Sequence, residues 1–558
     1  MKTRNLFNKN CLVSFYSGFI LFSLTACNEL YQEETVNVDS SNEEFVQLNH
    51  VLSHLEYGSD IIIVQKGTSI QEAVNAAHPG DMIFIEPGIY KEAITVNKPN
   101  LKLVGACSTS DEQVILENPG NEPFAVSLIN ESAYVSVSNI QFVNYGEEST
   151  QVKQLKCAGR GTRKILYNIT REELGNGVAH YKYDVQMGPG EFDRVRIHRV
   201  VKEYRPYHPV RTQGDVFMVH GAPQDFEDIF LIGGAEVINA STSAPYYMAE
   251  KNIDVWGIDL AWNFIPAETE DLSFMQGWGF EKDIDHTLVA MALSRLIRGL
   301  TGQGFDRMNL LGFSYGVPVA YGAAGRETRL HPLLKQIKGI IPVDSHLKID
   351  QSKYDELHTI ECASAAEFKA GLDAGVYYSD WGKLLIMLAD LALTAPDDPS
   401  PIPDFEGLTN SQAMILIGIA ENDGYWHFFG GDMETLTFHF TDADRFFRAV
   451  ANMAPYMPLQ SLYEIYACSC NEEDVSFDDH LGDINIPILN LISRGGEGNI
   501  GLYTPTQTSS TDITNEIISV DGYDRTQDYG HADLWFGDDA DKLVWEKLVD
   551  WLTSHAKR

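Results

Sequence analysis

The feature that most constrains the fold is a buried apolar run that ends in a tight turn around one serine. Met308 to Gly325 has the sequence MNLLGFSYGVPVAYGAAG, in which Gly312 to Gly316 form G-x-S-x-G around Ser314. This pattern predicts a strand, a sharp turn and a helix of small residues, because a Cβ at either glycine would collide with the strand or the helix. Such a turn lifts the serine hydroxyl clear of the strand, and the helix points its first N–H groups at the same place.

Three further segments accompany this turn in a fixed order. Asp215 to Ala222 (DVFMVHGA) precedes it and predicts a buried strand that ends in a close backbone turn. Ile486 to Asn499 (IPILNLISRGGEGN) follows it and predicts a strand with a Gly-rich turn that carries Glu497. Asp528 to Leu534 (DYGHADL) places His531 in a loop before the last amphipathic helix. The chain thus offers a serine, an acid and a histidine in that order.

With this order of residues the chain resembles the α/β-hydrolase superfamily, over roughly Lys182 to Arg558. The resemblance implies an α/β fold, with a mostly parallel sheet covered by helices on both faces. It also implies a helical cap over residues 345–484, where Gly382 to Leu393 and Asp442 to Met457 show helical patterns. The last residues are similar to the tails of acid lipases and related esterases, which implies cleavage of a carboxylic ester.

The resemblance assigns roles to individual residues. Ser314 is the expected nucleophile and His531 the expected base, with a buried carboxylate that orients the imidazole. Glu497 lies a few residues beyond its strand, at the superfamily's usual position for the acid, although Asp is more common there. Asp344, at the end of the preceding strand in IIPVDS, is the alternative acid, because some lipase-like members place theirs at that point.

The backbone N–H groups of Tyr315 and Ala222 are expected to form the oxyanion hole. No cofactor is implied, because a triad and an oxyanion hole suffice for acyl transfer. The sequence has no C-x-x-C, H-E-x-x-H or EF-hand spacing, so no metal site is predicted. Two alternatives stay open: a serine peptidase or amidase with the same triad, and a non-catalytic cell-surface lipoprotein that binds glycans or acts as a scaffold.

Residues 61–148 show a different pattern, of short apolar strands at even intervals. Stretches such as DMIFIEPG, EAITV and LKLVGA are separated by Gly, Pro and Asn turns, which predicts stacked coils. The run from Pro79 to Gly105 resembles the opening coils of right-handed parallel β-helix proteins related to pectate lyases. We expect a short β-helix that acts as a spacer, with contact to a polysaccharide as the alternative.

The first 26 residues have the features of an export signal. Lys2, Arg4 and Lys9 precede a largely apolar stretch, and residues 24–27 (LTAC) resemble the lipobox of bacterial lipoproteins, in which Cys27 becomes the lipidated first residue. We therefore expect an exported protein anchored by its lipid in a bacterial cell envelope. Residues 27–60 would be a tether, and residues 162–558 the hydrolase domain that acts on a small-molecule or lipid ester.

The charge of the chain narrows the range of partners. With 41 basic and 79 acidic side chains the net charge is −38, which argues against nucleic acid and against binding to anionic lipid through a basic patch. The acyl anchor would then be the contact with a membrane. Five cysteines lie beyond the signal and lipobox, and their odd number and wide spacing predict no disulfide framework: Cys107, Cys157, Cys362, Cys468 and Cys470.

Overall fold

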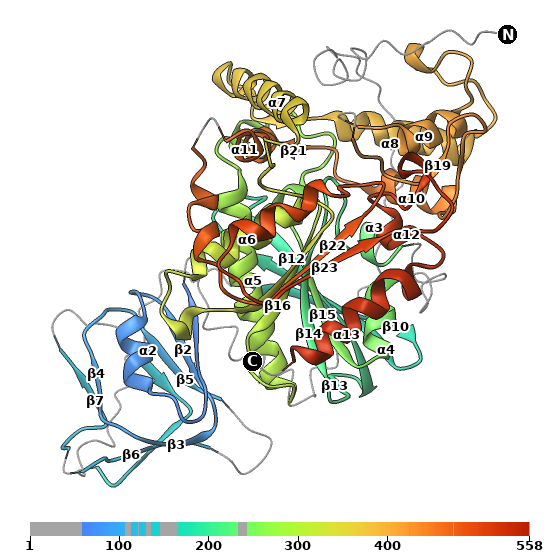
Figure 1. Ribbon diagram of the computed structural model, residues 1–558. Helices are drawn as coiled ribbons and strands as arrows, with labels where there is room; N and C mark the ends of the chain where they lie inside the picture. The colour runs from blue at the N-terminus through green and yellow to red at the C-terminus, as the bar shows by residue number, and fades with distance from the viewer. Residues whose placement is uncertain are drawn as a thin grey trace.

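The computed structural model describes residues 59–106, 113–120, 122–129, 135–145, 166–232, 243–422, 425–471 and 474–556 (Figure 1). The predicted signal peptide, Cys27, the tether up to residue 58, Cys107 and Cys157 lie outside these residues. Among the helices described, none combines the length and the apolar character that a membrane span requires.

The centre of the molecule is a mixed sheet with strand order β10-β11-β12-β15-β14-β16-β17-β22-β23, and β13 pairs with β12. The strands are β10 (Leu166–Gly175), β11 (Val178–Gln186), β12 (Arg194–Arg205), β13 (His208–Pro209), β14 (Gly214–Val219), β15 (Ile253–Asp259), β16 (Met308–Phe313), β17 (Ile337–Val343), β22 (Ile488–Ser493) and β23 (Ile513–Ile518). Pairing is antiparallel from β10 to β15 and parallel from β15 to β23. This mostly parallel sheet has the arrangement expected of an α/β-hydrolase fold.

Helices cover both faces of the sheet, as the long apolar runs predict. On β16, Met308 and Leu310 pack with α5 (Phe280–Leu300) and α6 (Gly316–Glu327), whereas Leu311 and Phe313 face the opposite core. That second core contains α3 (Phe226–Phe230), α4 (Ala244–Glu250), α12 (Asp533–Phe536) and α13 (Glu546–Ser554). Successive apolar residues of this strand therefore belong to different cores, and the buried strands are mostly apolar, with single polar residues such as Asn309 on β16.

The strand order changes direction between β14 and β16. The chain runs from β14 to β15 on one side and then crosses to place β16 on the other side of β14. In open parallel sheets, sites form at the carboxyl ends of the strands beside such a switch point. The turn with Ser314 and the loop with Ala222 both leave the sheet there.

Five α-helices are described between β17 and β22. They are α7 (Asp355–Asp373), α8 (Trp381–Thr394), α9 (Asn410–Ile419), α10 (Ala443–Asn452) and α11 (Leu459–Cys470). Short strand pairs accompany them: β18 (Tyr378–Ser379) with β21 (Met457–Pro458), and β19 (Gly431–Asp432) with β20 (Thr437–Phe438). α10 ends five residues before the predicted limit at Met457, because Pro455 disfavours a helical conformation for the residue before it.

The described residues of the N-terminal segment form three small sheets in which every pair is parallel. The strands are β1 (Ile61–Val64), β2 (Met82–Ile85), β3 (Gly88–Lys91), β4 (Ile94–Val96), β5 (Lys102–Gly105), β6 (Val114–Glu117), β7 (Val126–Leu128), β8 (Ser136–Ser138) and β9 (Ile140–Val143), with helix α2 (Ile70–Ala76) after β1. The sheets have the orders β1-β2-β5-β8, β3-β6-β9 and β4-β7. The chain therefore visits the three sheets in turn.

In the sheet β1-β2-β5-β8, the strands β1, β2 and β5 are buried between two cores, whereas β8 is only partly buried. Ile62, Ile83 and Leu103 point into the core of the N-terminal segment, whereas Met82 and Phe84 belong to the core that contains α5 and α6. The ring of Phe84 lies 5.3 Å from that of Phe305, which follows α5. Figure 1 shows this blue segment beside α5. The coils and the central sheet thus share a hydrophobic core.

Candidate active site

Ser314 lies on the tight turn that its motif predicts. It has a φ of 52°, in the left-handed region that few non-glycine residues adopt, and its N–H donates to the carbonyl of Val343 over 3.0 Å. A Cβ on Gly312 would lie 1.9 Å from the carbonyl oxygen of Gly316, and one on Gly316 would lie 2.4 Å from that of Val219. Both glycines are therefore required, and the predicted strand–turn–helix is confirmed. Strain of this kind accumulates at functional sites.

The loop after β14 lies against this serine. A Cβ on Gly221 would come within 3.1 Å of the Cβ of Ser314. His220 braces the loop: its Nδ1–H donates to the carbonyl of Gly221 over 2.8 Å, and its Nε2 accepts the N–H of Leu260 over 3.3 Å. Burial lowers the pKa of His220, which favours this neutral form. The next residue is Ala222, so the loop carries its N–H to the neighbourhood of the serine.

The carboxylate beside His531 is Asp344, and the preference for Glu497 was wrong. Nδ1 of His531 lies 2.9 Å from Oδ2 of Asp344, whereas Oε2 of Glu497 lies 2.6 Å from Nδ1 of His346. The physical reason is the turn after β22, which brings backbone rather than the glutamate side chain to Asp344. A Cβ on Gly496 would lie 2.0 Å from Oδ2 of Asp344.

Asp344 is enclosed by hydrogen-bond donors. Its two oxygens accept the N–H of Ser493 over 2.6 Å and the hydroxyl of Ser493 over 2.8 Å, in addition to His531. Only 1% of its surface is exposed, and this burial raises its pKa above the ordinary aspartate value. Its own φ of 51° turns it away from the direction of β17. These donors fix the carboxylate in one orientation.

Aromatic rings surround the imidazole of His531. The ring of Phe313 stacks on it at 4.6 Å between centroids, Trp426 lies at 5.1 Å and Phe428 at 6.0 Å. The backbone N–H of His531 donates to the carbonyl of His427 over 2.9 Å. Phe313 precedes the serine, so it links the turn with the histidine. The side chains on this side of the imidazole are therefore apolar.

Asp533 holds the loop of His531 in shape, whereas its position two residues beyond His531 predicts a cap for the last helix, whose N-cap is Trp545. One oxygen accepts the N–H groups of Gly430 and Gly530 over 2.7 and 2.8 Å, and the other accepts the hydroxyl of Thr441 over 2.6 Å. The carboxylate lies two residues beyond the histidine, and it joins this loop to the segment between α9 and α10. The local sequence DYGHADL contains Asp533 itself but does not indicate its contacts with Gly430 and Thr441.

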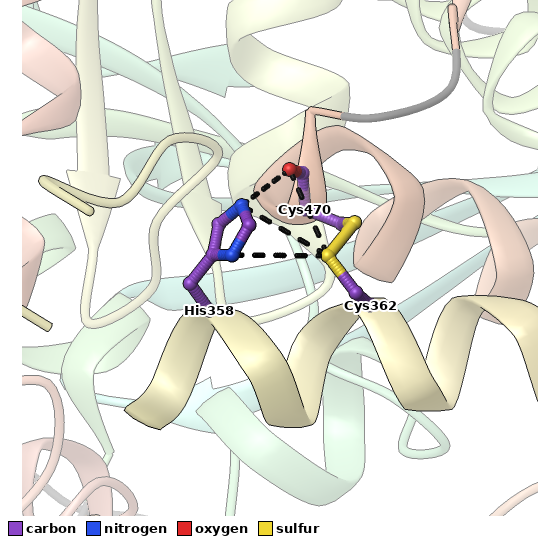
Figure 2. A group of neighbouring side chains, drawn as sticks. All are labelled: His358, Cys362 and Cys470. Carbon is purple, nitrogen blue, oxygen red and sulfur yellow. Dashed lines mark hydrogen bonds between the residues drawn. A yellow bond between two sulfur atoms is a disulfide. The ribbon is translucent and has the colours of Figure 1, made fainter. Parts of the chain in front are cut away.

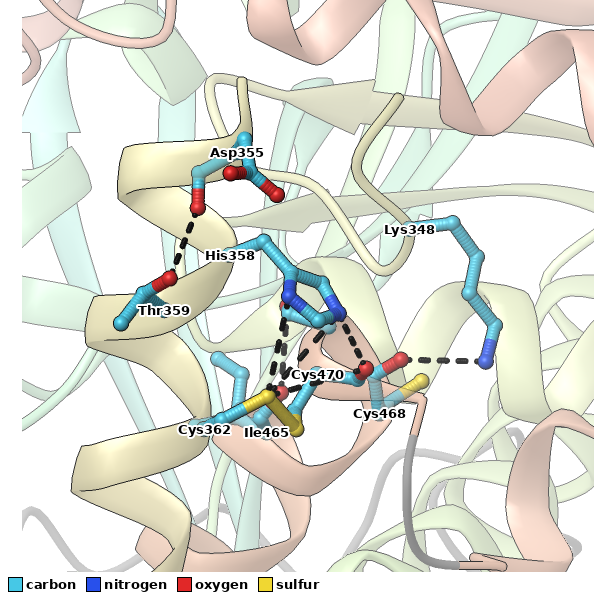
Figure 3. The surroundings of a disulfide bond; sticks show 9 residues. Lys348, Asp355, His358, Thr359, Cys362, Ile465, Cys468 and Cys470 are labelled. Atoms are coloured by element: carbon cyan, nitrogen blue, oxygen red, sulfur yellow. Dashed lines mark hydrogen bonds between the residues drawn. A yellow bond between two sulfur atoms is a disulfide. The ribbon is translucent and has the colours of Figure 1, made fainter. Parts of the chain in front are cut away.

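One group of potential metal ligands is formed by His358, Cys362 and Cys470 (Figure 2). Its two sulfur atoms are joined in a disulfide that connects α7 with α11. His358 Nε2 lies 2.7 Å from the carbonyl oxygen of Cys470, as Figure 3 shows in its surroundings. Because both thiols are consumed by the disulfide, this group does not offer a set of metal ligands.

A second group, His180, His198 and Glu227, lies on β11, β12 and α3. A cation already lies at Glu227, since Lys182 Nζ is 2.6 Å from Oε1. His198 Nε2 lies 2.9 Å from Asp259, and its other nitrogen lies 2.9 Å from His180. The side chains of this group are therefore already paired with groups of the protein. The third group, Asp60, His78 and Asp81, lies mostly at the surface, where acidic clusters are common.

No protein-family model matches the chain, and no curated protein matches it. Solved structures are similar at low identity. A lipase described as putative from Sulfolobus solfataricus is 19% identical with a TM-score of 0.48, over 69% of this chain and 99% of that one. The open form of a lipase is 18% identical with a TM-score of 0.37, over 68% and 100%. A proline iminopeptidase from Mycobacterium smegmatis is 12% identical with a TM-score of 0.34, over 70% and 99%. The fold assignment rests instead on the strand order and the serine turn.

Proposed function

We propose that this protein is a serine hydrolase that cleaves carboxylic esters through Ser314, His531 and Asp344. The observation that carries the proposal is the contact of 2.9 Å between His531 Nδ1 and a buried carboxylate, on the same sheet edge as a serine held at positive φ. A carboxylate in this place fixes the imidazole tautomer, so that Nε2 is free to accept a proton.

The reaction follows from these roles. The hydroxyl oxygen of Ser314 attacks the ester carbonyl carbon while Nε2 of His531 takes the hydroxyl proton. The N–H groups of Tyr315 and Ala222 stabilise the negative charge that develops on the carbonyl oxygen. His531 then donates its proton to the leaving alcohol. In the second half of the reaction, water attacks the acyl-enzyme while His531 takes a proton from it, and His531 then returns this proton to the oxygen of Ser314. Asp344 stabilises the imidazolium in both halves of the reaction.

The rings around His531 favour an ester with an apolar group. Trp426 and Phe428 are only partly buried, and both contact the imidazole that must reach the leaving group. Apolar surfaces of this kind lower the free energy of a bound acyl chain or aryl group by about 25 cal/mol for each Å² removed from water. We therefore propose a small-molecule or lipid ester as the substrate.

A fluorophosphonate probe tests the activated serine. We expect the purified protein to be labelled at Ser314, a Ser314→Ala variant to remain unlabelled, and a matched Ser469→Ala variant of a buried serine on α11 to be labelled like the parent. Absence of labelling in the parent protein would contradict the proposal. A series of p-nitrophenyl esters, compared with aminoacyl anilides, then separates an esterase from a peptidase or amidase.

We also propose that the protein is exported and anchored through a lipid on Cys27. The disulfide between Cys362 and Cys470 supports export, because disulfides persist in oxidising compartments. A Cys27→Ala variant should move from the membrane fraction to the soluble fraction of cells, and the lipid should disappear from the mass of its N-terminal peptide. Unchanged fractionation would contradict the anchor.

For residues 61–148 we propose a short parallel β-helix whose role is structural. Its support is the parallel pairing of every described strand pair in this segment and the shared core with α5. The alternative role is contact with a polysaccharide. In that case the protein should be retained on immobilised glycans, whereas a purely structural role predicts no retention.

A further inference from the structure

The side chain of Tyr315, next to the serine, is fixed at its hydroxyl by two other helices. Its hydroxyl donates to Oδ2 of Asp283 on α5 over 2.5 Å, and the hydroxyl of Ser461 on α11 lies 2.8 Å from the same oxygen. A phenol has one proton, so Ser461 donates to Tyr315 when Tyr315 donates to Asp283. All three side chains are buried, with exposed fractions of 4%, 2% and 0%.

The ring of Tyr315 is fixed as well. The ring of Phe280 lies 4.7 Å from it and that of Trp262 lies 5.7 Å from it, edge to face. Tyr315 occupies the N-cap position of α6 without a capping hydrogen bond from its side chain, so its backbone N–H and its side chain leave one Cα at the start of the helix. A side chain held at both its ring and its hydroxyl restricts the rotation of that Cα and therefore the direction of the N–H.

We propose that Asp283 and Ser461 are positioning residues, which hold the backbone N–H of Tyr315 in the direction that an oxyanion requires. Through Ser461 the helix α11, 146 residues further along the chain, becomes part of the geometry of the oxyanion hole. This inference rests on the proposed hydrolase function. It gives Tyr315 two separate roles, one for its main chain at the substrate and one for its side chain within the protein.

The charge of Asp283 is expected to modulate this arrangement. Burial raises the pKa of Asp283 to about 7, and the groups that face it are Tyr315, Lys282, Trp262 and Glu464. The hydroxyl of Tyr315 and the ammonium of Lys282 lower this pKa, whereas Glu464 raises it. Above pH 7 the hydrogen bond from Tyr315 is charge-assisted and stronger, and below pH 7 it joins two neutral groups.

The test compares Asp283→Asn, Tyr315→Phe and Ser461→Ala with the parent protein on one chromogenic ester. Above pH 7 we expect kcat to fall about tenfold in each while KM stays within about twofold, because the change affects a group that acts in the transition state. The rate of fluorophosphonate labelling should fall in parallel, since the probe forms a tetrahedral adduct whose oxygen occupies the same place. The Asp283→Asn/Tyr315→Phe double variant should lose no more than either single variant.

The pH profile supplies a readout that a structural role would not change. The ratio of parent to Asp283→Asn kcat should be near one at pH 5.5 and rise through pH 7. Thr287→Val, a buried substitution on α5, and Ser469→Ala, one on α11, are the matched controls and should keep the parent kcat.

Thermal midpoints show which variants are folded. If the folded variants keep the kcat and the labelling rate of the parent, the inference is overturned. Ser461→Ala removes a single hydroxyl and keeps the test decisive if the other variants do not fold. Absence of labelling in the parent protein would instead contradict the proposed function, so the two failures are distinguishable.

Discussion

The backbone N–H of Glu497 lies 3.4 Å from Oδ1 of Asp344, yet each of the two carboxylates binds its own histidine. Asp344 pairs with His531 and Glu497 with His346, and both pairs lie at the carboxyl edge of the sheet after β17 and β22. The negative charge of Glu497 raises the pKa of Asp344, secondary to burial. Glu497 thus affects the pKa of Asp344, although its own carboxylate pairs with His346 and not with His531.

This arrangement predicts unequal effects of removing the two charges. Asp344→Asn should lower kcat by about 10³-fold or more, because the imidazole loses the carboxylate that sets its tautomer. Glu497→Gln should lower kcat by about tenfold or less, since its partner is His346. Steady-state kinetics on one ester measure both, and a larger loss for Glu497→Gln would show that the glutamate is the acid.

The turn after β22 predicts a second effect on the same carboxylate. Gly496→Ala places a Cβ 2.0 Å from Oδ2 of Asp344, so either the turn or the carboxylate must move. We expect a lower thermal midpoint and a lower kcat together. Gly482→Ala is the control, because the nearest atom to its added Cβ lies 3.8 Å away. Parent-like kinetics in Gly496→Ala would show that the acid tolerates displacement.

The disulfide between α7 and α11 should stabilise the folded protein. It joins residues 108 positions apart, and closing a loop of that length restricts the unfolded chain by about 4 to 5 kcal/mol in the chain-entropy model. A Cys362→Ala/Cys470→Ala variant should have a lower thermal midpoint that a dithiol reductant leaves unchanged. The parent should lose stability on adding the reductant, and equal midpoints would contradict this.

Glu327, at the end of α6, predicts a pH dependence of stability away from the site. It accepts the N–H groups of Gln336 and Ile337 over 2.6 and 3.0 Å, and burial raises its pKa from 4.5 to about 7. The folded state then binds the proton more tightly than the unfolded state. Its contribution to stability is present below pH 4.5 and is lost as the pH rises to about 7.

Glu327→Gln should therefore reduce the loss of unfolding free energy between pH 4.5 and 7. The slope will not vanish, because the pKa values of Asp283 and Asp533 are also raised to about 7. Denaturant unfolding at several pH values, for the parent and the variant, measures the difference. If the unfolding free energy changes with pH equally in the two proteins, the pKa of Glu327 is not raised in the folded state.

Local patterns predicted the central strands β14, β16, β17 and β22 and the serine turn. Strands buried on both faces are mostly apolar runs, as in β14, β16 and β22, and such runs are visible in the sequence. The turn was predictable because the motif G-x-S-x-G has glycine, which lacks a Cβ, at the two positions where a Cβ would collide with the backbone. The loops that carry His220 and His531 followed from their places at the ends of predicted elements.

The acid was not predictable, because two carboxylates fit the order of serine, acid and histidine. The outcome depends on the φ of 51° at Asp344 and on the close approach of Gly496, neither of which has a signature of its own. The contact of Tyr315 with Ser461 and the pairing of Cys362 with Cys470 depend on the packing of α11. Spacing in the sequence contains no information on such packing.

The two-faced sheet β1-β2-β5-β8 makes the N-terminal coils and the central sheet one unit of unfolding. Met82 and Phe84 belong to the core that contains α5, and the ring of Phe84 lies against that of Phe305, so loss of the coils would expose apolar surface on the remaining protein. Cooperative transitions arise where two segments cannot lose their contacts separately. The sequence pattern predicts a domain boundary near residue 162, but we expect no separate unfolding of the parts on its two sides. The coils and the central sheet should melt in a single transition.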